Sequence, residues 1–169
     1  MEPPKECFRV HTSAGGHKSL NSLVALAKGD FLCAFQGTYQ PRPTRHSIQV
    51  GPSEHMLVDP EALRYINHSC DPNVAFDVRR RIVRALRPVA PGDEFLYFYP
   101  STEWDMAAPF DCECGAACCL GRIQGAAHLP PDVLARYELQ HHIQERLTSR
   151  INGPAPGYIL RPIEGGDLS

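Results

Sequence analysis

Four cysteines in one short segment have the spacing of a metal site. The run Cys112-Glu113-Cys114-Gly115-Ala116-Ala117-Cys118-Cys119 places four thiols within eight residues. Its glycine permits the sharp reversal that turns the first two cysteines toward one ion. Tetrahedral zinc takes four ligands, with sulfur at about 2.3 Å, and buried thiols without a metal seldom cluster so densely. The segment therefore predicts a structural Zn²⁺ site, although spacing alone does not decide between Cys118 and Cys119.

A second polar run carries a further cysteine and a hydrogen-bonding pair. It reads Arg64-Tyr65-Ile66-Asn67-His68-Ser69-Cys70-Asp71-Pro72-Asn73. The Asp-Pro-Asn triplet favours a turn, so the preceding side chains should lie on a constrained loop. Asn67 and His68 can grip a heteroaromatic ligand, although such a pair is more often a structural one. Cys70 is available as a fourth thiolate for the ion.

Two phenols follow in the run Tyr97-Phe98-Tyr99. Because successive side chains of a strand point to opposite faces, Tyr97 and Tyr99 should share a face and Phe98 should point the other way. Taken alone, this pattern is typical of a core whose hydroxyl groups reach water. The phenols become candidates for chemistry only beside other functional groups.

The elements that position these residues are expected to be mainly strands. Turn residues separate β-rich runs at 7–10, 31–36, 47–50, 56–58, 74–78, 82–86 and 95–99. The triplets Lys28-Gly29-Asp30 and Pro91-Gly92-Asp93 predict tight turns, in which glycine takes a positive φ. Residues 60–66 allow at most two helical turns. We therefore expect a mainly β fold with short helices.

A longer helix is predicted over 132–150, after the cysteines. Its expected apolar stripe has i+4 spacing and consists of Ala135, Leu139, Ile143, Leu147 and Ile151. Asn152-Gly153-Pro154 should end the helix. Glu138, His141 and His142 lie off the stripe and are expected on a solvated face. The following tail is expected to be ordered only where Tyr158, Ile159 and Leu160 dock.

The bulk composition limits the possible classes. A chain of 169 residues fits one domain, and its net charge of -2 with a pI near 6.4 argues against direct nucleic-acid binding. Arg79-Arg80-Arg81 is expected to be a hairpin turn. No run approaches the roughly 20 apolar residues of a membrane span, and no signal peptide is evident. Seven cysteines, an odd number, favour reduced thiols, so we expect a soluble intracellular protein.

The two polar runs and the cysteine segment resemble the motifs of one family. The run from Arg64 resembles the signature of SET-domain protein lysine methyltransferases. Gly92-Asp93-Glu94-Phe95-Leu96-Tyr97-Phe98-Tyr99 is similar to their second signature, which ends in the catalytic tyrosine. The cysteine segment resembles their post-SET zinc motif. The resemblance spans about residues 8–123, so it covers most of the chain, and it contains the three motifs in order.

The resemblance implies a fold, a reaction and a set of site residues. The fold would be the SET-domain β-fold, with several small curved sheets and knot-like threading that brings Tyr99 beside Asn67. The reaction would transfer methyl from S-adenosylmethionine to a lysine amine of a protein substrate. Tyr99 would act beside the methyl group and Tyr97 would be a second channel phenol. The implied cofactor-binding residues are Lys18, Ser19, Leu20, Arg64, Asn67, His68 and Tyr99, with Leu120 as an apolar lid.

The same resemblance assigns the zinc ligands and the segments of the chain. In the family's motif a residue and a glycine follow the last cysteine, as Leu120-Gly121 do here, which selects Cys119 over Cys118. The implied ligands are Cys70, Cys112, Cys114 and Cys119. We expect a SET catalytic domain over 1–110, a post-SET zinc segment over 111–125, and a C-terminal helix and tail over 126–169.

Some positions depart from the family's pattern. The usual Gly-x-Gly cofactor loop is replaced by His17-Lys18-Ser19, although Gly15-Gly16 just upstream would restore it by a register shift. His46 stands where a tyrosine is common, and Phe98 where an acidic residue is common. The alternative to an active enzyme is a SET-like protein that no longer methylates and serves as a binding module or a scaffold for another reaction. Trp104 is expected over the cofactor, in a substrate groove, or in the core.

Overall fold

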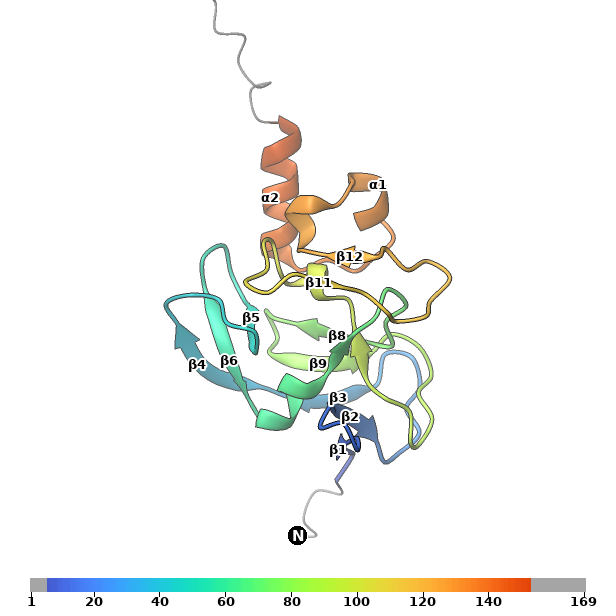
Figure 1. Cartoon of the computed structure of the whole chain (residues 1–169). Coiled ribbons are helices and arrows are strands. Elements are labelled where there is room, and N and C mark those ends of the chain that lie inside the picture. Colours follow the sequence, from blue (N-terminus) through green and yellow to red (C-terminus); the bar gives the residue numbers. More distant parts are fainter. Residues whose placement is uncertain (1–5, 153–169) are drawn as a thin grey trace, which may run out of the picture.

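The computed structural model describes residues 6–152, which form mainly short strands (Figure 1). Five small sheets account for the named strands of this part of the chain. The strands are β1 Phe8–Thr12, β2 Lys18–Ser22, β3 Phe31–Ala34, β4 Gln36–Gln40, β5 Ser47–Gln49, β6 His55–Asp59, β7 Asn67–His68, β8 Val74–Asp77, β9 Ile82–Ala85, β10 Leu96–Tyr97, β11 Phe110–Asp111 and β12 Arg122–Ile123. The expected mainly β class is confirmed.

Two three-stranded sheets and one hairpin build the body of the molecule. The sheets have the orders β4-β6-β5 and β3-β9-β8, and β1 pairs antiparallel with β2. Strand β6 alternates partly exposed and buried residues, because one face of its sheet covers the core. Strands β2 and β4 had not been predicted, since polar residues dominate both and β4 follows β3 after a single residue.

The main core fills the space between these sheets. Its fully buried members include Leu20, Val83 and Phe95, each with no exposed surface. Phe76 packs edge-on against Tyr97, with 4.9 Å between ring centroids. The core therefore reaches directly to the back of one of the candidate phenols.

The predicted turns have the expected backbone. Gly29 and Gly92 have φ of 90° and 93°, which a residue without a side chain adopts at little cost. The run 79–81 connects β8 to β9, as expected of a hairpin turn, and Arg81 itself has a φ of 57°. The short helix expected at 60–66 is a 3₁₀ turn, η1 Glu61–Tyr65. A second 3₁₀ turn, η2 Tyr99–Ser101, follows β10 directly, and a third, η3 Ala126–His128, follows β12.

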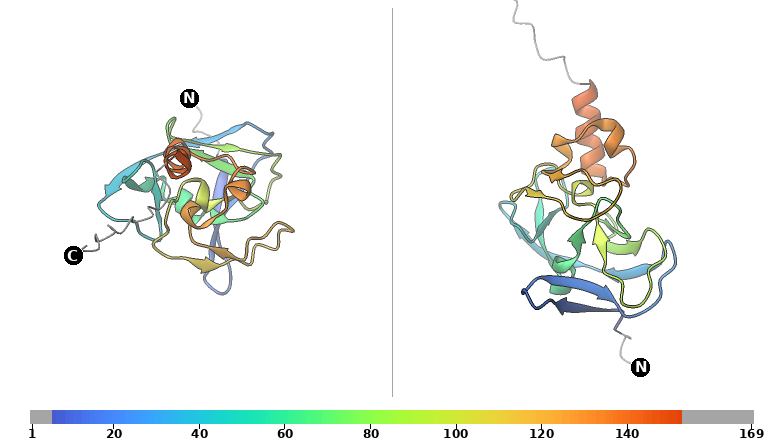
Figure 2. Two further views of the ribbon diagram at one scale, coloured as in Figure 1. Left: turned by 90° about the horizontal axis from the view of Figure 1, so that it is seen from above. Right: turned by 45° about the vertical axis from the view of Figure 1, so that its right-hand side comes forward.

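The single helix predicted over 132–150 is wrong, because the structure breaks it in two. Helix α1 spans Pro131–Leu134 and helix α2 spans His141–Asn152, and α2 lies at the end of the molecule opposite the β1–β2 hairpin (Figures 1 and 2). Between them, Tyr137 stacks on Phe98 with 3.6 Å between ring centroids. The Gln140 side chain accepts a hydrogen bond from the Val78 backbone N–H at 3.0 Å. These tertiary contacts outweigh local helical propensity.

The apolar stripe predicted for this helix is wrong at both ends. Ile143 is fully buried in a second core with Phe98, Ala126 and Leu134. Ala135, however, lies exposed after α1 has ended, and Ile151 is 68% exposed. The predicted stripe is wrong because its i+4 spacing holds only along one continuous helix, and the structure has two helices here. The predicted stop at Asn152 coincides with the last helical residue, whereas Tyr158, Ile159 and Leu160 lie outside the described residues.

The solvated face expected for three residues of this region is only partly right. Glu138 is exposed and forms an ion pair with Arg84. His142, in contrast, has no exposed surface, and its Nε2 lies 2.8 Å from the Thr102 carbonyl oxygen. The ring is buried because α2 packs its first turn against the segment that follows Tyr99. Within the described residues, no helix has the length and apolar character needed to cross a membrane.

Gly125 should be more sensitive to a side chain than Gly92. Both have positive φ, which costs a non-glycine residue about 1–3 kcal/mol. A Cβ at Gly125 would also lie 2.5 Å from the Trp104 carbonyl oxygen, whereas at Gly92 nothing lies within 4 Å. Gly125→Ala should therefore lower the unfolding temperature more than the matched Gly92→Ala, at roughly 2–4 °C per kcal/mol. Equal shifts in thermal melts would contradict this packing.

Candidate active site and metal centre

A large cleft opens beside the paired signature segments. Its volume is about 1260 Å³, and its walls come from residues 15–18, 44–48, 63–68, 94, 96–97, 99, 103, 106–110 and 112–114. Small-molecule pockets usually occupy about 300–1000 Å³. The cleft is thus large enough for a nucleoside-sized cofactor together with a side chain from a second molecule.

Parallel pairing of β7 with β10 brings the two signature runs together. Asn67 lies opposite Leu96, and His68 lies opposite Tyr97. Just beyond, the Tyr99 hydroxyl donates to the Ile66 carbonyl oxygen at 3.2 Å. The expected proximity of Tyr99 to Asn67 is therefore present, although the two residues are 32 positions apart in the sequence.

The two phenols form the aromatic wall of this cleft. The rings of Tyr97 and Tyr99 lie 4.6 Å apart between centroids. Burial raises the pKa of Tyr99 to about 12, against the opposing effect of Arg45. Burial also raises the pKa of Tyr97 well above its usual value, and the charge of Glu103 adds to that effect. Both hydroxyl groups are thus neutral at physiological pH and serve as hydrogen-bond donors rather than bases.

His68 links the cleft to the cysteine segment. Burial lowers its pKa to about 4, so the ring is neutral. Nδ1 accepts a hydrogen bond from the Tyr99 backbone N–H at 3.2 Å, which leaves the ring proton on Nε2, 3.4 Å from the Cys70 sulfur. Both ring nitrogens are therefore engaged within the protein. His68 also lines the cleft, so the expected cofactor contact remains a prediction, made through its backbone or the face of its ring.

Asn67 ties the N-terminal segment to the second signature. Its Nδ2 donates to the Lys18 carbonyl oxygen at 3.0 Å and to Glu94 Oε1 at 2.7 Å, and it lies 3.1 Å from His17 Nε2. Arg64 also lines the cleft, and its Nε donates to the Val58 carbonyl oxygen at 2.7 Å. These contacts hold one rim of the cleft in place.

The structure revises the cofactor residues expected near the N-terminus. Lys18 lines the cleft, and its Nζ donates to the Tyr65 hydroxyl at 3.3 Å. Ser19 is 7% exposed and Leu20 is fully buried in the main core, and neither residue lines the cleft. The cofactor contact expected at these two positions remains a prediction, and it would involve the backbone of β2 rather than the side chains. Gly15 and Gly16 line the cleft instead, as the register-shift alternative requires.

The four expected metal ligands form one cluster. Among the described residues, the sulfur atoms of Cys70, Cys112, Cys114 and Cys119 all lie within 4.8 Å of one another. Sulfurs of a tetrahedral site with bonds of about 2.3 Å stand about 3.8 Å apart, so a small inward shift suffices to hold zinc. Cys118 instead donates to the Cys70 carbonyl oxygen at 3.2 Å. The geometry selects Cys119, and the all-sulfur donor set suits Zn²⁺.

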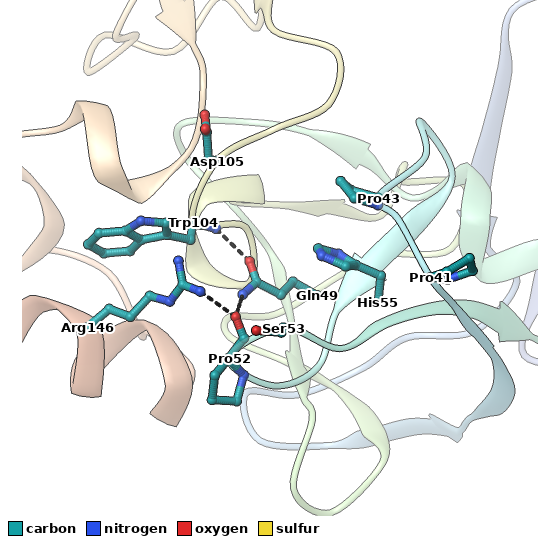
Figure 3. A pocket seen from close by; sticks show the side chains of 9 residues that line it. All are labelled: Pro41, Pro43, Gln49, Pro52, Ser53, His55, Trp104, Asp105 and Arg146. Carbon is teal, nitrogen blue, oxygen red and sulfur yellow. Dashed lines mark hydrogen bonds between the residues drawn. The ribbon is translucent and has the colours of Figure 1, made fainter.

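Leu120 and Trp104 lie away from the wall of the large cleft. Leu120 packs against the second core, and its backbone N–H lies 3.4 Å from the Cys70 sulfur. The lid role expected for its side chain therefore has no support among the cleft contacts. Trp104 lines a separate pocket of about 230 Å³ (Figure 3). The Arg146 guanidinium lies against the face of the Trp104 ring, 5.4 Å from the ring centroid. Of the places expected for Trp104, the structure supports the core, because Trp104 is partly buried and packs against the second core.

Glu103 lines the cleft although nothing in the sequence had singled it out. It is 7% exposed, and its Oε1 accepts hydrogen bonds from the Gln49 backbone N–H at 2.7 Å and the Thr102 hydroxyl at 3.1 Å. An acidic residue between threonine and tryptophan resembles an ordinary loop residue. The available signal was its position only four residues after Tyr99, on a segment that must stay close to the cleft.

Comparison with known proteins identifies a family. A model described as the SET domain matches residues 22–100. The chain is 40% identical over 141 residues to the methyltransferase flvH of Aspergillus flavus, and the match covers 82% of this chain and 79% of flvH. It is 38% identical over 73 residues to the histone-lysine N-methyltransferase mes-4 of Caenorhabditis elegans, covering 34% of this chain and 8% of mes-4.

The fold also has a counterpart among solved structures. The structure of KRYPTONITE in complex with mCHH DNA, an H3(1-15) peptide and SAH matches with a TM-score of 0.53 at 23% identity. This match covers 68% of the chain and 29% of KRYPTONITE, so the chain spans less than a third of that protein. At this identity the likeness establishes the shared fold.

Removal of one ligand should release the metal, whereas removal of the neighbouring thiol should not. Cys70→Ala deletes a member of the cluster, while Cys118→Ala deletes a cysteine that lies outside it. We expect about one zinc per protein by elemental analysis in wild type and Cys118→Ala, and loss of zinc with reduced thermal stability in Cys70→Ala. Zinc retained in Cys70→Ala and lost from Cys118→Ala would overturn the ligand assignment.

Proposed function

Because the chain belongs to the family of SET-domain methyltransferases, we propose that it transfers a methyl group from S-adenosylmethionine to a lysine side-chain amine of a protein substrate. The observation that carries this proposal is the pair of phenols beside the crossing of β7 and β10, inside the large cleft. A protein that only binds a partner has no need of a buried phenol at that place.

The cofactor, when bound, supplies an electrophilic methyl group on a sulfonium. One end of the cleft offers backbone without side chains at Gly15 and Gly16, together with the charged side chains of Lys18 and Arg64. The Asn67 amide holds the Lys18 carbonyl in place beside them. These residues would hold the polar parts of the cofactor and leave the aromatic end of the cleft for the reacting groups.

Tyr99 is proposed to lie beside the transferred methyl group. Its hydroxyl donates to the Ile66 carbonyl, and its backbone N–H donates to His68, so both ends of the residue are fixed. In-line transfer depends on holding the amine and the methyl carbon in one line, which a rigid aromatic channel favours. The neutral phenol can also steady charge that develops during the transfer.

The lysine substrate fits the walls of this channel. Tyr97, Tyr99 and Ile48 present apolar surface along which the methylene stem of a lysine can lie. Histone-lysine methylation is the activity named for mes-4. For this chain we propose a protein lysine in general as the substrate.

Replacement of Tyr99 by phenylalanine should separate catalysis from cofactor binding. The change removes one hydroxyl and keeps the ring, so turnover should fall by about 100-fold or more. The affinity for S-adenosylhomocysteine, measured by isothermal titration calorimetry, should stay within a few-fold of wild type. Unchanged turnover would remove Tyr99 from the mechanism. No detectable binding of S-adenosylhomocysteine by wild type would favour the alternative of a SET-like protein that does not methylate.

Tyr97 should limit the number of methyl groups added. Its hydroxyl and any water that it holds occupy space that a second methyl group would need, and the ring is fixed against Phe76 and Tyr99. His46 lies exposed at the rim and does not close the opposite wall as a buried phenol would. We expect mass spectrometry to show mainly one added methyl group in wild type and two or more in Tyr97→Phe. Predominant trimethylation by wild type would refute this argument.

A further inference from the structure

Glu103 places a buried carboxylate in the wall of the cleft that contains Tyr97 and Tyr99. The residue is only 7% exposed, yet it lines the same cavity as the two phenols. Its negative charge raises the pKa of both phenols, in each case in addition to the larger effect of burial. The carboxylate and the phenols therefore face a common space.

The carboxylate is held rigidly by its hydrogen bonds. The Gln49 N–H and the Thr102 hydroxyl both donate to Oε1. Gln49 is itself fixed, because its side chain accepts from the Trp104 N–H at 2.9 Å and donates to the Pro52 carbonyl (Figure 3). It also donates to the Gly51 carbonyl. A carboxylate held in this way is preorganised, and both of these bonds leave Oε2 for another partner.

Glu103 has no paired cation among the described residues. His142 of α2 lies behind Thr102. The other ionisable groups that line the cleft are the two phenols, Tyr65, Lys18, Arg45, Arg64, His17, His46, His68, Glu94, Glu113, Cys112 and Cys114. Burial lowers the pKa of His142, so that ring is neutral. Burial raises the pKa of Glu103 to about 7, although the bonds from Gln49 and Thr102 oppose the shift.

A buried carboxylate with no cation beside it is costly unless a ligand completes the pair. The substrate proposed above brings an ammonium group into the same cleft, but only a neutral amine can attack a methyl group. The site thus needs an anion to receive the ammonium and a base to accept one proton. Glu103 has the charge and the position for both roles.

We propose that Glu103 binds the lysine ammonium of the substrate as its counter-ion and accepts one proton from it before methyl transfer. This inference rests on the proposed function. The N–H bond breaks and its proton joins a Glu103 oxygen, which leaves a lone pair on nitrogen. That pair forms the new N–C bond while the C–S bond breaks and its electrons remain on sulfur. The product leaves as a methylated ammonium, and Glu103 later returns its proton to water.

This role determines the pH dependence of the reaction. Below about pH 7 the free carboxylate becomes protonated and can neither pair with the ammonium nor accept its proton. The value of kcat/KM should therefore rise up to about pH 7 and then level off. Without an internal base, the rate would instead follow the small fraction of free amine and rise about tenfold per pH unit toward the lysine pKa near 10.4.

The test compares wild type with Glu103→Gln and with Asp105→Asn. Glutamine keeps the acceptor oxygen for Gln49 and Thr102 but removes the charge. Asp105 lies two residues away, is exposed and pairs with His128, so it controls for charge on the same segment. With poly-L-lysine as the methyl acceptor, Glu103→Gln should lose about 100-fold or more in kcat/KM at pH 7 and gain the tenfold slope per pH unit. Asp105→Asn should keep the wild-type profile.

A binding measurement separates this inference from the proposed function. n-Butylammonium, a probe for the lysine side chain, is titrated into protein saturated with S-adenosylhomocysteine. Wild type and Asp105→Asn should bind it at least tenfold more tightly than Glu103→Gln, and wild-type affinity should fall as the pH drops below 7. Equal affinity in Glu103→Gln, no binding by wild type, or binding by wild type that does not change with pH would overturn the role of Glu103. Absence of methylation with these binding differences intact would overturn the proposed function alone.

Unfolding of Glu103→Gln would not leave the question open, because two of these measurements need only wild type. The level region of kcat/KM above pH 7 and the loss of n-butylammonium affinity below pH 7 both follow from the ionised carboxylate. A continuous tenfold rise per pH unit in wild type would contradict the proposal. The calorimetric titration of S-adenosylhomocysteine into each variant reports whether the rest of the site remains intact.

Discussion

The parallel contact between β7 and β10 is the constraint on which the rest of the site depends. Only two residues of each strand pair, yet they align Asn67 with Leu96 and His68 with Tyr97. Asn73 fastens the crossing from one side, because its side chain accepts from the Leu96 N–H and donates to the Glu94 carbonyl, each at 2.8 Å. Each of these short strands would be unstable alone, so the main core and the hairpins must hold them in register.

Two further contacts hold the segments on either side of this crossing. His68 connects it to the cysteine cluster, since its ring lies between the Tyr99 N–H and the Cys70 sulfur. A metal in that cluster would therefore stabilise the backbone of Tyr99 as well as the cysteine segment. On the other side, the start of α2 holds the segment after Tyr99. The Gln140 N–H donates to the Ser101 carbonyl, and Nε2 of His142 contacts the carbonyl oxygen of Thr102. Glu103 is positioned by the same segment.

The fold was predictable where the local sequence pattern agrees with the packing of the tertiary structure. Strands β6, β8 and β9 lie within a residue or two of the predicted runs. Strands β6 and β9 alternate buried and partly buried residues, as expected of a half-buried sheet, and β8 is a short apolar run of mostly buried residues. Helix α2 was predicted too long, because periodicity does not register the contacts of Tyr137 and Gln140 that interrupt it. Strand β2 was missed since its own composition is mostly polar, and its buried Leu20 packs with residues distant in sequence such as Phe95.

By itself, the sequence determined the chemical groups of the site. The four ligand thiols, the two phenols and the Asn67-His68 pair are short motifs whose residue types and spacing are visible in the chain, and the structure brings them together around one cleft. Only the tertiary structure decided which groups face that cleft. It buried Ser19 and Leu20 away from the cleft, bonded both ring nitrogens of His68 to neighbouring groups, and brought Glu103 to the phenols. The physical reason is that direction and burial are set by packing between segments far apart in the sequence, which no local spacing records.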